Sequence, residues 1–452
     1  MKFVHTVMAA SLTLALSGQT QAAVSATEAA KLGNELTLIG AEKAGNVDGS
    51  IPAYKGGLTT PPADFKKGDS MRPDPFSTEK PLLVIDGKNV DQYKGLLTAT
   101  TAELARRYPS YRIEVYPTHR TASLPQGVLD NSVKNATGAR STQGGNAIEN
   151  VFPGTPFPVP QSGAEAMWNH LLRYQGLNVE LKYDSWNVDS TGTASLATTG
   201  TLHSNYPAYD DLSKPLAGTD VYYQTKLEYS GPARRAGEAV MLRDAVNPLE
   251  QPRRAWQYLP GQRRVKLAPS LDYDTPNPGT AGTATWDDAY VFNGALDRFD
   301  WKLIGKQEMI VPYNTYRVTY QKDVKPMLTP NHLAPEFLRW EKHRVWVVEA
   351  TLKPSARHIY AKRRFYLDED TWVALASDQY DANGKLYRGV YTFITQNYEQ
   401  PVPNASPYLT YDLVAGSYSA IGLPGPYGGI KYGASLSKTQ WSPESLAGAG
   451  IR

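Results

Sequence analysis

The sequence predicts an α+β fold: one large, curved antiparallel sheet, open like a half-barrel, with covering helices and a long irregular N-terminal wrap. Two observations support this class. From about residue 178 onward, apolar and polar residues alternate in short segments that turn residues separate. Before that point, Gly and Pro interrupt the chain so often that only short helices are expected. Successive strands joined by tight turns favour an antiparallel sheet over a doubly wound parallel one.

The composition is that of a globular chain, and it excludes several classes of function. The 452 residues are 41% hydrophobic and 20% charged, with 29 Tyr, 9 Trp and 10 Phe. The chain has no cysteine, which excludes disulfides, thiolate metal sites, a cysteine nucleophile and a lipidated cysteine. The 47 basic and 44 acidic residues are spread along the chain, so nucleic acid is not expected as a partner.

Residues 1–22 have the pattern of a secretory signal peptide. An early lysine precedes an apolar stretch at 7–16, and small residues follow it. This stretch is shorter than the roughly 20 residues that a membrane span requires. We therefore expect an exported periplasmic protein, without a lipid anchor, that begins at Ala23 or Thr27 after cleavage.

The rest of the chain, 23–452, is expected to form a single domain in three parts. Residues 23–176 would form the helical and irregular wrap and lid, and residues 177–398 the antiparallel sheet. Residues 399–452, which are rich in Gly and Pro, would form an irregular C-terminal tail. No repeat of fixed period is present, which disfavours solenoids and propellers.

The clearest helix of the first part follows a proline-rich stretch. Ser162 and Glu165 have the spacing of a capping box, and Gly176 supplies a stop signal. Apolar residues recur between them at helical period, including Trp168 and Leu171. This aromatic stripe would either pack on the sheet as an ordinary core or cover a ligand as a lid.

The strands of the sheet are expected wherever the alternation is regular. The segment 221–229 alternates most clearly. Residues 255–267 form a hairpin in which Pro260 and Gly261 suit the centre of a type II turn. Further strands are expected at 301–304, 313–320, 344–352, 359–367, 372–380 and 386–393.

Sequence motifs for catalysis or metal binding are absent. The histidines stand apart, with neither a His-x-x-x-His nor a His-Glu-x-x-His spacing, and no nucleophile elbow or nucleotide-binding loop occurs. No cofactor and no metal are therefore expected. The best catalytic candidate is His119, next to Arg120. The acidic pair at 287–288 lacks the spaced oxygen ligands of a calcium loop, so these carboxylates are expected in a solvated turn.

Short basic clusters occur at 234–235, 253–254, 263–264 and 362–364. Such clusters usually form solvated faces that protect edge strands. The alternative is electrostatic docking to an acidic partner or to anionic lipid head groups.

Several aromatic-rich strings resemble a known bacterial family. They occur at 116–120, 154–176, 253–265, 273–278 and 343–350. Together they make the chain resemble, from about Leu36 to Tyr398, the family called domain of unknown function 1329. That family is similar in fold to the periplasmic lipoprotein carriers of the LolA and LolB type. The resemblance implies a LolA-like half-barrel with an apolar cavity under its helices, and it carries over no catalytic residue.

The same resemblance implies partners in the cell envelope. Relatives are often encoded beside inner-membrane transporters of the resistance-nodulation-division class and beside an outer-membrane barrel. A protein of this kind would shuttle a molecule between the two membranes.

The leading hypothesis is thus a non-enzymatic periplasmic carrier or binding protein for a lipid or another hydrophobic molecule. One alternative is a periplasmic hydrolase that acts on a lipid-like substrate with His119 as base. Another is a non-catalytic envelope adaptor whose core is filled. Six side chains are predicted to bind the ligand: Trp168, Leu171, Trp256, Tyr258, Trp346 and Phe365.

Overall fold

The computed structural model describes residues 24–433 and 436–450, so the predicted export signal lies outside the described residues. The helices are α1 (Ala26–Ala29), α2 (Ala99–Arg107), α3 (Gln126–Gly138), α4 (Gly163–Leu171) and α5 (Tyr316–Thr319). The first strands are β1 (Leu83–Ile85), β2 (Ile113–Val115), β3 (Arg140–Thr142), β4 (Ala147–Glu149), β5 (Asn178–Val188), β6 (Ala194–Asn205), β7 (Val221–Gly231), β8 (Ala239–Ala245), β9 (Arg254–Leu259) and β10 (Arg264–Leu267). The later strands are β11 (Phe299–Pro312), β12 (Trp340–Leu352), β13 (Lys362–Asp368), β14 (Ala374–Tyr380), β15 (Leu386–Thr392), β16 (Thr395–Asn397), β17 (Val402–Asn404), β18 (Tyr408–Asp412), β19 (Ser417–Leu423) and β20 (Ile430–Tyr432).

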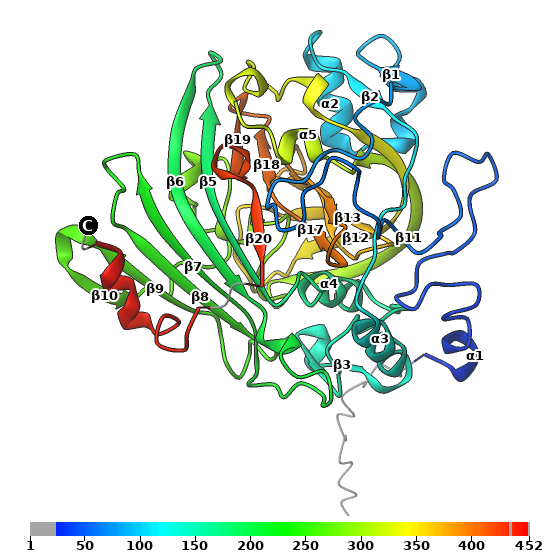
Figure 1. Ribbon diagram of the computed structural model, residues 1–452, viewed down its shortest axis with the longest axis horizontal. Helices are drawn as coiled ribbons and strands as arrows, with labels where there is room; N and C mark the ends of the chain where they lie inside the picture. Colours follow the sequence, from blue (N-terminus) through cyan, green and yellow to red (C-terminus); the bar gives the residue numbers. More distant parts are fainter. Residues whose placement is uncertain (1–23, 434–435, 451–452) are drawn as a thin grey trace, which may run out of the picture.

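One curved sheet of 16 strands dominates the molecule (Figure 1). Its order is β1-β2-β12-β13-β14-β15-β18-β19-β5-β6-β7-β8-β9-β10, with β11 beside β12 and β20 beside β5. All neighbours pair antiparallel except β2 and β12. Strands β18 and β19 separate two parts of this sheet, which we call its halves: β5 to β10 on one side and β11 to β15 on the other. The predicted α+β class with a large open antiparallel sheet is confirmed.

Most predicted strands are present, including the hairpin of β9 and β10. The type II turn predicted at Pro260 and Gly261 is wrong. Residues 260–262 form a 3-10 turn, Arg263 has a positive φ of 47°, and Leu259 pairs with Arg264. The strand predicted at 313–320 is wrong. Strand β11 ends at Pro312, Asn314 has a positive φ of 50°, and the short helix α5 follows. The rings of Tyr316 and Tyr320 explain the difference, because their spacing of four residues suits one face of a helix.

The irregular tail predicted at 399–452 is also wrong. Strands β18 and β19 lie in the middle of the sheet, between β15 and β5. Every residue of β18 is buried. A strand that is covered on both faces has no polar side, so it lacks the alternation by which the other strands were predicted.

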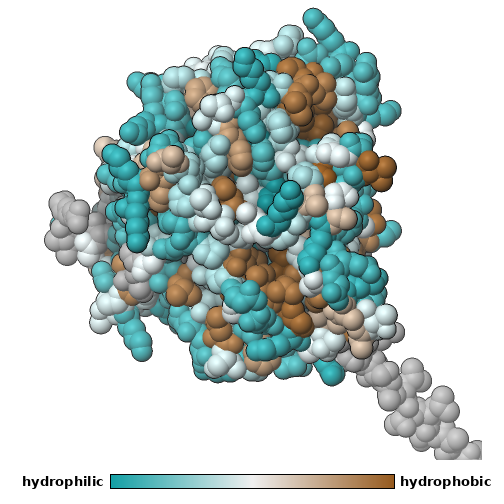
Figure 2. Space-filling view, turned by 45° about the vertical axis from the view of Figure 1, so that its right-hand side comes forward, coloured by the Kyte–Doolittle hydropathy of each residue, from teal (hydrophilic) through white to brown (hydrophobic). Residues whose placement is uncertain are grey.

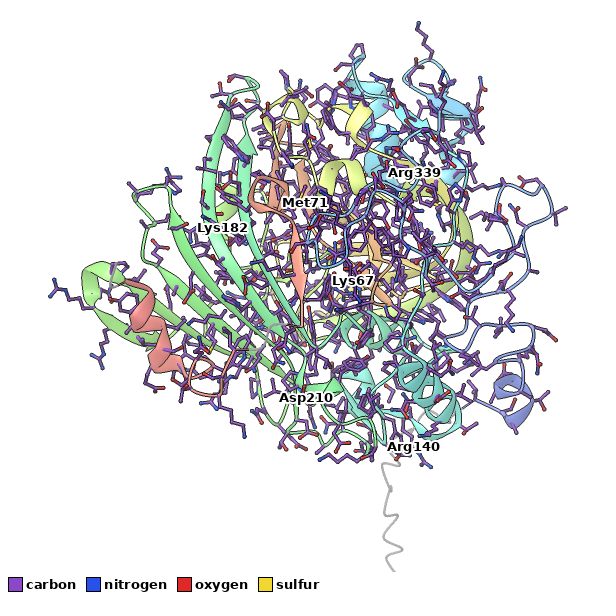
Figure 3. All side chains as sticks on the ribbon, viewed as in Figure 1. Lys67, Met71, Arg140, Lys182, Asp210 and Arg339 are labelled. Carbon is purple, nitrogen blue, oxygen red and sulfur yellow. The ribbon has the colours of Figure 1, made fainter. Side chains whose placement is uncertain are left out.

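The N-terminal segment before β1 forms the expected irregular wrap. Its apolar side chains, among them Phe65 and Met71, pack against the rings of Tyr316 and Tyr398. Figure 3 places Lys67 and Met71 across the middle of the molecule. The segment is also held by charge, because the Arg72 guanidinium lies 2.5 Å from the carboxylate of Glu399.

The helix predicted after the proline-rich stretch is confirmed as α4. The Ser162 hydroxyl accepts a hydrogen bond from the Glu165 amide at 3.2 Å, as expected for a helix cap. The helix ends at Leu171, before Gly176. All of its residues are buried, and it packs against β11 and β12.

The surface carries no continuous apolar belt on the face in Figure 2. That face is mostly hydrophilic, with hydrophobic side chains gathered in separate groups. Within residues 24–433 and 436–450, no helix has both the length and the apolar character needed to cross a membrane.

Candidate functional site

An apolar pocket lies between strands β5 to β8 and the segment 277–293 that crosses over them. Its empty volume is about 790 Å³, including the part open to solvent. A smaller pocket of about 340 Å³ adjoins it and shares Leu181, Leu202 and Tyr290 in its lining.

The apolar floor of the pocket follows from strand register. Leu181 on β5 pairs with Leu202 on β6, which pairs with Leu227 on β7. Directly paired residues point to the same face, so the three leucines form a row across the strands. All three line the pocket.

Tyrosine rings form the walls. Tyr183 on β5 and Tyr229 on β7 both lie opposite Gly200 on β6. A Cβ at Gly200 would lie 3.1 Å from the Tyr183 hydroxyl, so glycine makes room for that ring. Burial raises the pKa of Tyr183 and of Tyr290 well above the usual value. The walls are therefore neutral phenols at physiological pH.

The cover of the pocket is the segment 277–293, which contributes Trp286 and Tyr290. The Trp286 Nε1–H is buried and has no hydrogen-bond partner among the described residues. Tyr290 and Val291 have positive φ values of 54° and 75°. A β-branched residue at such a φ is strained, so neighbouring contacts must hold this turn in place.

Buried ion pairs supply those contacts. Arg363 on β13 donates to Asp287 at 2.8 Å, to Asp288 at 3.0 Å and to the Val291 carbonyl at 3.3 Å. The Nε2 of His358 lies 3.0 Å from the same Asp287 carboxylate. Burial by itself raises the pKa of Asp287, but Arg363 and His358 outweigh it and hold that pKa below the usual value.

The expectation of a solvated turn at 287–288 is therefore wrong. Asp287 and Asp288 are both buried. They neutralise Arg363, whose side chain lies in the core. The basic run at 362–364 is likewise not entirely on a solvated face, because Arg363 is fully buried.

Arg253 closes one end of the pocket. Its guanidinium donates twice to Asp244, at 2.7 Å each, and once to Asp272 at 3.4 Å. It also donates to the Asn293 side chain, which ties the cover to the sheet. Burial disfavours the charge of Arg253, but Asp244 and Asp272 outweigh this effect and raise its pKa. This arginine, too, was expected on a solvated face, but its side chain is only 5% exposed.

The six residues predicted to bind the ligand lie elsewhere. Trp168, Leu171 and Phe365 are buried in the core around α4. Trp346 stacks on Trp372 with ring centroids 6.0 Å apart. The other two, Trp256 and Tyr258, face the C-terminal segment 436–450. None of the six lines the pocket between β5 to β8 and the cover.

The alternation of apolar and polar residues in β7 is the sequence signal that corresponds to the pocket. The lining includes Tyr223, Thr225, Leu227 and Tyr229, which are the alternate residues of the strand with the clearest pattern. The cover residues gave no comparable signal, because Trp286 and Tyr290 lie in an irregular segment.

His119, the predicted catalytic candidate, lies between Glu79 and Phe76. Its Nε2 is 2.7 Å from the Glu79 carboxylate, and its ring stacks on Phe76 with centroids 4.0 Å apart. Among the described residues, no serine or threonine hydroxyl is hydrogen-bonded to its ring.

A family model described as "Protein of unknown function (DUF1329)" matches residues 84–447. The chain therefore belongs to this family, as its aromatic-rich strings indicated. An uncharacterized protein of Pseudomonas aeruginosa, PA3922, is 41% identical over 443 residues, which cover 97% of this chain and 96% of that protein.

Three solved structures match part of the chain, each with a TM-score below 0.5. A domain from Vibrio parahaemolyticus, described as an outer membrane lipoprotein-sorting protein, is 14% identical and covers 63% of this chain and 98% of that one, with a TM-score of 0.44. A DUF1329 protein from Desulfovibrio piger is 14% identical over 60% of this chain and 92% of its own, with a TM-score of 0.41. A LolA superfamily protein from Nitrosomonas europaea is 10% identical over 63% of this chain and 100% of its own, with a TM-score of 0.37.

Proposed function

We propose that this protein is a periplasmic carrier or binding protein that holds a mainly hydrophobic molecule, such as a lipid, in the pocket beneath the segment 277–293. The observation that carries the proposal is the row of Leu181, Leu202 and Leu227 between neutral tyrosine rings. Each Å² of apolar ligand surface that this lining removes from water contributes about 25 cal/mol to binding.

The polar groups of the pocket narrow the class of ligand. Arg253 is neutralised by Asp244 and Asp272, so the pocket offers no unpaired cation to an anionic head group. The buried Trp286 Nε1–H lacks an acceptor among the described residues. A ligand with one hydrogen-bond acceptor, such as an ester or hydroxyl oxygen on a hydrocarbon chain, would satisfy it.

The signal-peptide pattern supports a periplasmic location for this function, and the family resemblance supports partners in the cell envelope. A periplasmic carrier would receive its ligand from, or deliver it to, an inner-membrane transporter of the resistance-nodulation-division class and an outer-membrane barrel. Release would require the cover to move, because Trp286 and Tyr290 lie on it.

The test is binding of a neutral fluorescent probe, N-phenyl-1-naphthylamine, to the purified full chain. Leu227→Asp places a carboxylate in the pocket from a half-buried position, so the fold should tolerate it while the affinity falls at least tenfold. Leu267→Asp is the matched control, because Leu267 is 66% exposed on β10. Equal probe affinity in both variants would contradict the proposed site.

The six side chains predicted from the sequence are tested in the same assay. Phe365→Ala is expected to lower stability by about 3–5 kcal/mol, because the ring is fully buried. If the folded variant keeps its probe affinity, the role of Phe365 is packing. A loss of affinity as large as that of Leu227→Asp would instead move the site toward α4.

A further inference from the structure

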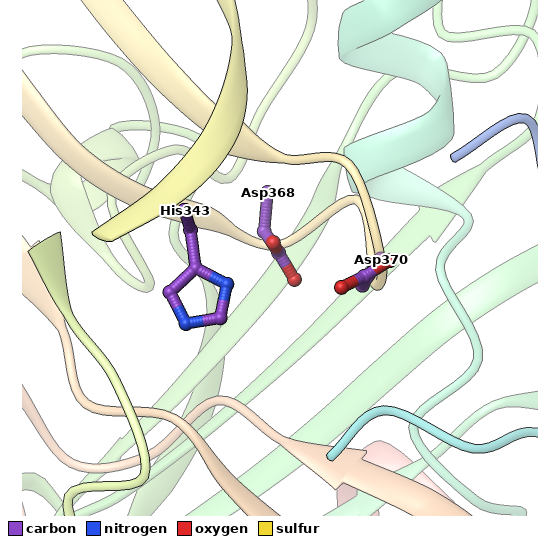
Figure 4. Close-up of side chains that lie close together, drawn as sticks. All are labelled: His343, Asp368 and Asp370. Atoms are coloured by element: carbon purple, nitrogen blue, oxygen red, sulfur yellow. The ribbon is translucent and has the colours of Figure 1, made fainter. Parts of the chain in front are cut away.

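A second cluster of functional groups lies away from the pocket, where β12 meets the turn between β13 and β14. His343 on β12, Asp368 at the end of β13 and Asp370 in the turn are all buried. One ring nitrogen and two carboxylate oxygens lie within 4.8 Å of one another. Figure 4 shows the three side chains in a row, with one edge of the imidazole toward Asp368.

Each of the three side chains is held by a neighbour. The Glu341 carboxylate lies 3.0 Å from His343 Nε2 and can only accept, so Nε2–H donates to it and Nδ1 is the ring nitrogen that could bind a metal ion. Asp370 is gripped by two hydrogen bonds from Arg120, of 2.8 and 2.6 Å. In the pair of Glu341 and His343, a carboxylate holds the imidazole from the far side. Carboxylates orient metal-binding imidazoles in this way in many proteins.

Asp368 is the member of the cluster with an unpartnered oxygen among the described residues. Its Oδ2 accepts from Tyr313 at 3.0 Å and from Thr371 at 2.7 Å. Its Oδ1 is buried without any hydrogen-bond partner among the described residues. A buried carboxylate oxygen with nothing to bind is costly, so the structure leaves one position at this oxygen for a further group.

The balance of charge indicates what that group is. The adjacent acids are paired: Glu369 with Arg120, Lys306 and Arg344, and Asp370 with Arg120. No ion pair to Asp368 is found in the described part of the chain. A cation at Oδ1 would complete the pairing of these three successive acids.

We propose that His343, Asp368 and Asp370 bind a divalent transition-metal ion, Zn²⁺ or Mn²⁺. A mixed set of imidazole and carboxylate ligands suits these ions better than Ca²⁺ or Mg²⁺, which take oxygen ligands. Ligand atoms about 2.1 Å from one ion lie about 3–4 Å apart. The observed spacing of up to 4.8 Å therefore closes with small side-chain movements.

One member of the cluster adjoins a pocket that opens to solvent. Asp370 also lines a solvent-facing pocket of about 1280 Å³ empty volume, together with Tyr54 and Lys43. The ion would link β12 to the turn after β13. Arg120, which binds Asp370, also donates to the Pro52 carbonyl, so the N-terminal wrap would be connected to the same cluster. This role is structural and independent of the ligand pocket, so either proposal can fail without the other.

The test is calorimetric titration of the full chain, stripped with a chelator, with Zn²⁺ and with Mn²⁺. We expect about one ion per chain, bound in the micromolar range or tighter. His343→Gln and Asp368→Asn should each weaken that binding at least tenfold. His332→Gln is the matched control, since His332 is buried to a similar degree but its ring bonds to Ser110 and to the Leu333 carbonyl instead of to carboxylates.

A second measurement needs no variant, and so it decides the question if the substituted chains do not fold. Crystals of the wild-type protein soaked in Zn²⁺ should give an anomalous peak within about 2.5 Å of His343 Nδ1 and an Asp368 oxygen. The proposal is overturned if the stripped chain takes up no stoichiometric ion or if the peak lies elsewhere. It is also overturned if both variants bind as the wild type does.

Discussion

The two halves of the sheet fill their interiors in opposite ways. Between β5 to β8 and the cover, leucines and neutral tyrosines leave empty space. Between β12, β13 and β14, charged side chains such as Arg363 and Glu341 are fully buried and paired. Apolar groups can border a void without losing hydrogen bonds, whereas a buried charge requires a fixed partner. The comparison indicates that the charged half provides rigid support and the apolar half provides room.

The largest effect should come from Arg363, which links the two halves. Arg363→Met would leave Asp287 and Asp288 buried without their cation, and we expect a loss of about 3–5 kcal/mol in unfolding free energy. Urea denaturation measures it. Lys362→Met is the control, because Lys362 is half-exposed and should change stability by less than about 1 kcal/mol. Equal losses of unfolding free energy in the two variants would contradict the supporting role of the buried charges.

A smaller effect concerns the one ionisable ring of α4. His170 Nδ1 accepts from the Ala374 amide at 3.0 Å, and Nε2 donates to the Phe292 carbonyl at 3.0 Å. Burial, and then the charge of Arg173, lowers its pKa well below the usual value.

The sign of the pH dependence follows from that lowered pKa. Below about pH 6.5 the unfolded chain binds a proton that the folded chain refuses. The contribution of His170 to the unfolding free energy is therefore fully present above about pH 6.5. Below that pH it falls by about 1.4 kcal/mol per pH unit. His170→Gln should remove this part of the slope between pH 7 and 5 in urea melts. A variant curve parallel to that of the wild type would contradict the assignment.

The smallest effect is expected at an exposed ion pair. Arg106 lies 2.6 Å from Asp91, closer than most of the buried pairs, but its side chain is 42% exposed and that of Asp91 75%. Solvent screens such a pair, so Arg106→Ala should cost less than about 1 kcal/mol in the same denaturation assay. A loss as large as that of Arg363→Met would show that distance, not burial, sets the energy.

Much of the fold could be predicted from alternation alone. Strands such as β7, with one face on the pocket, and the hairpin of β9 and β10 stood out because their two faces differ. The central strands β18 and β19 did not, because both of their faces are buried. The segment 313–320 was misread because aromatic residues are common in strands and in short helices alike.

The candidate sites were harder to predict, for a different reason. Trp168 and Phe365 were chosen because large rings favour binding surfaces, yet the same rings also fill ordinary cores. His343 and Asp368 are 25 positions apart in sequence, and only the turn after β13 brings them together. No local spacing rule can find such a pair, whereas the buried, unpartnered oxygen of Asp368 marks it in three dimensions.

The C-terminal segment 436–450 has a consequence for aggregation. It lies over β8 to β10 (Figure 1), where Trp441 and Leu446 cover Met241, Trp256 and Tyr258. Strand β10 is the last strand of the sheet order, so one of its edges is open to other chains. Without this segment, an apolar patch would adjoin an open strand edge, a combination that promotes intermolecular β-pairing. The segment thus shields the apolar patch beside the open edge of β10, and so it opposes self-association at this end of the sheet.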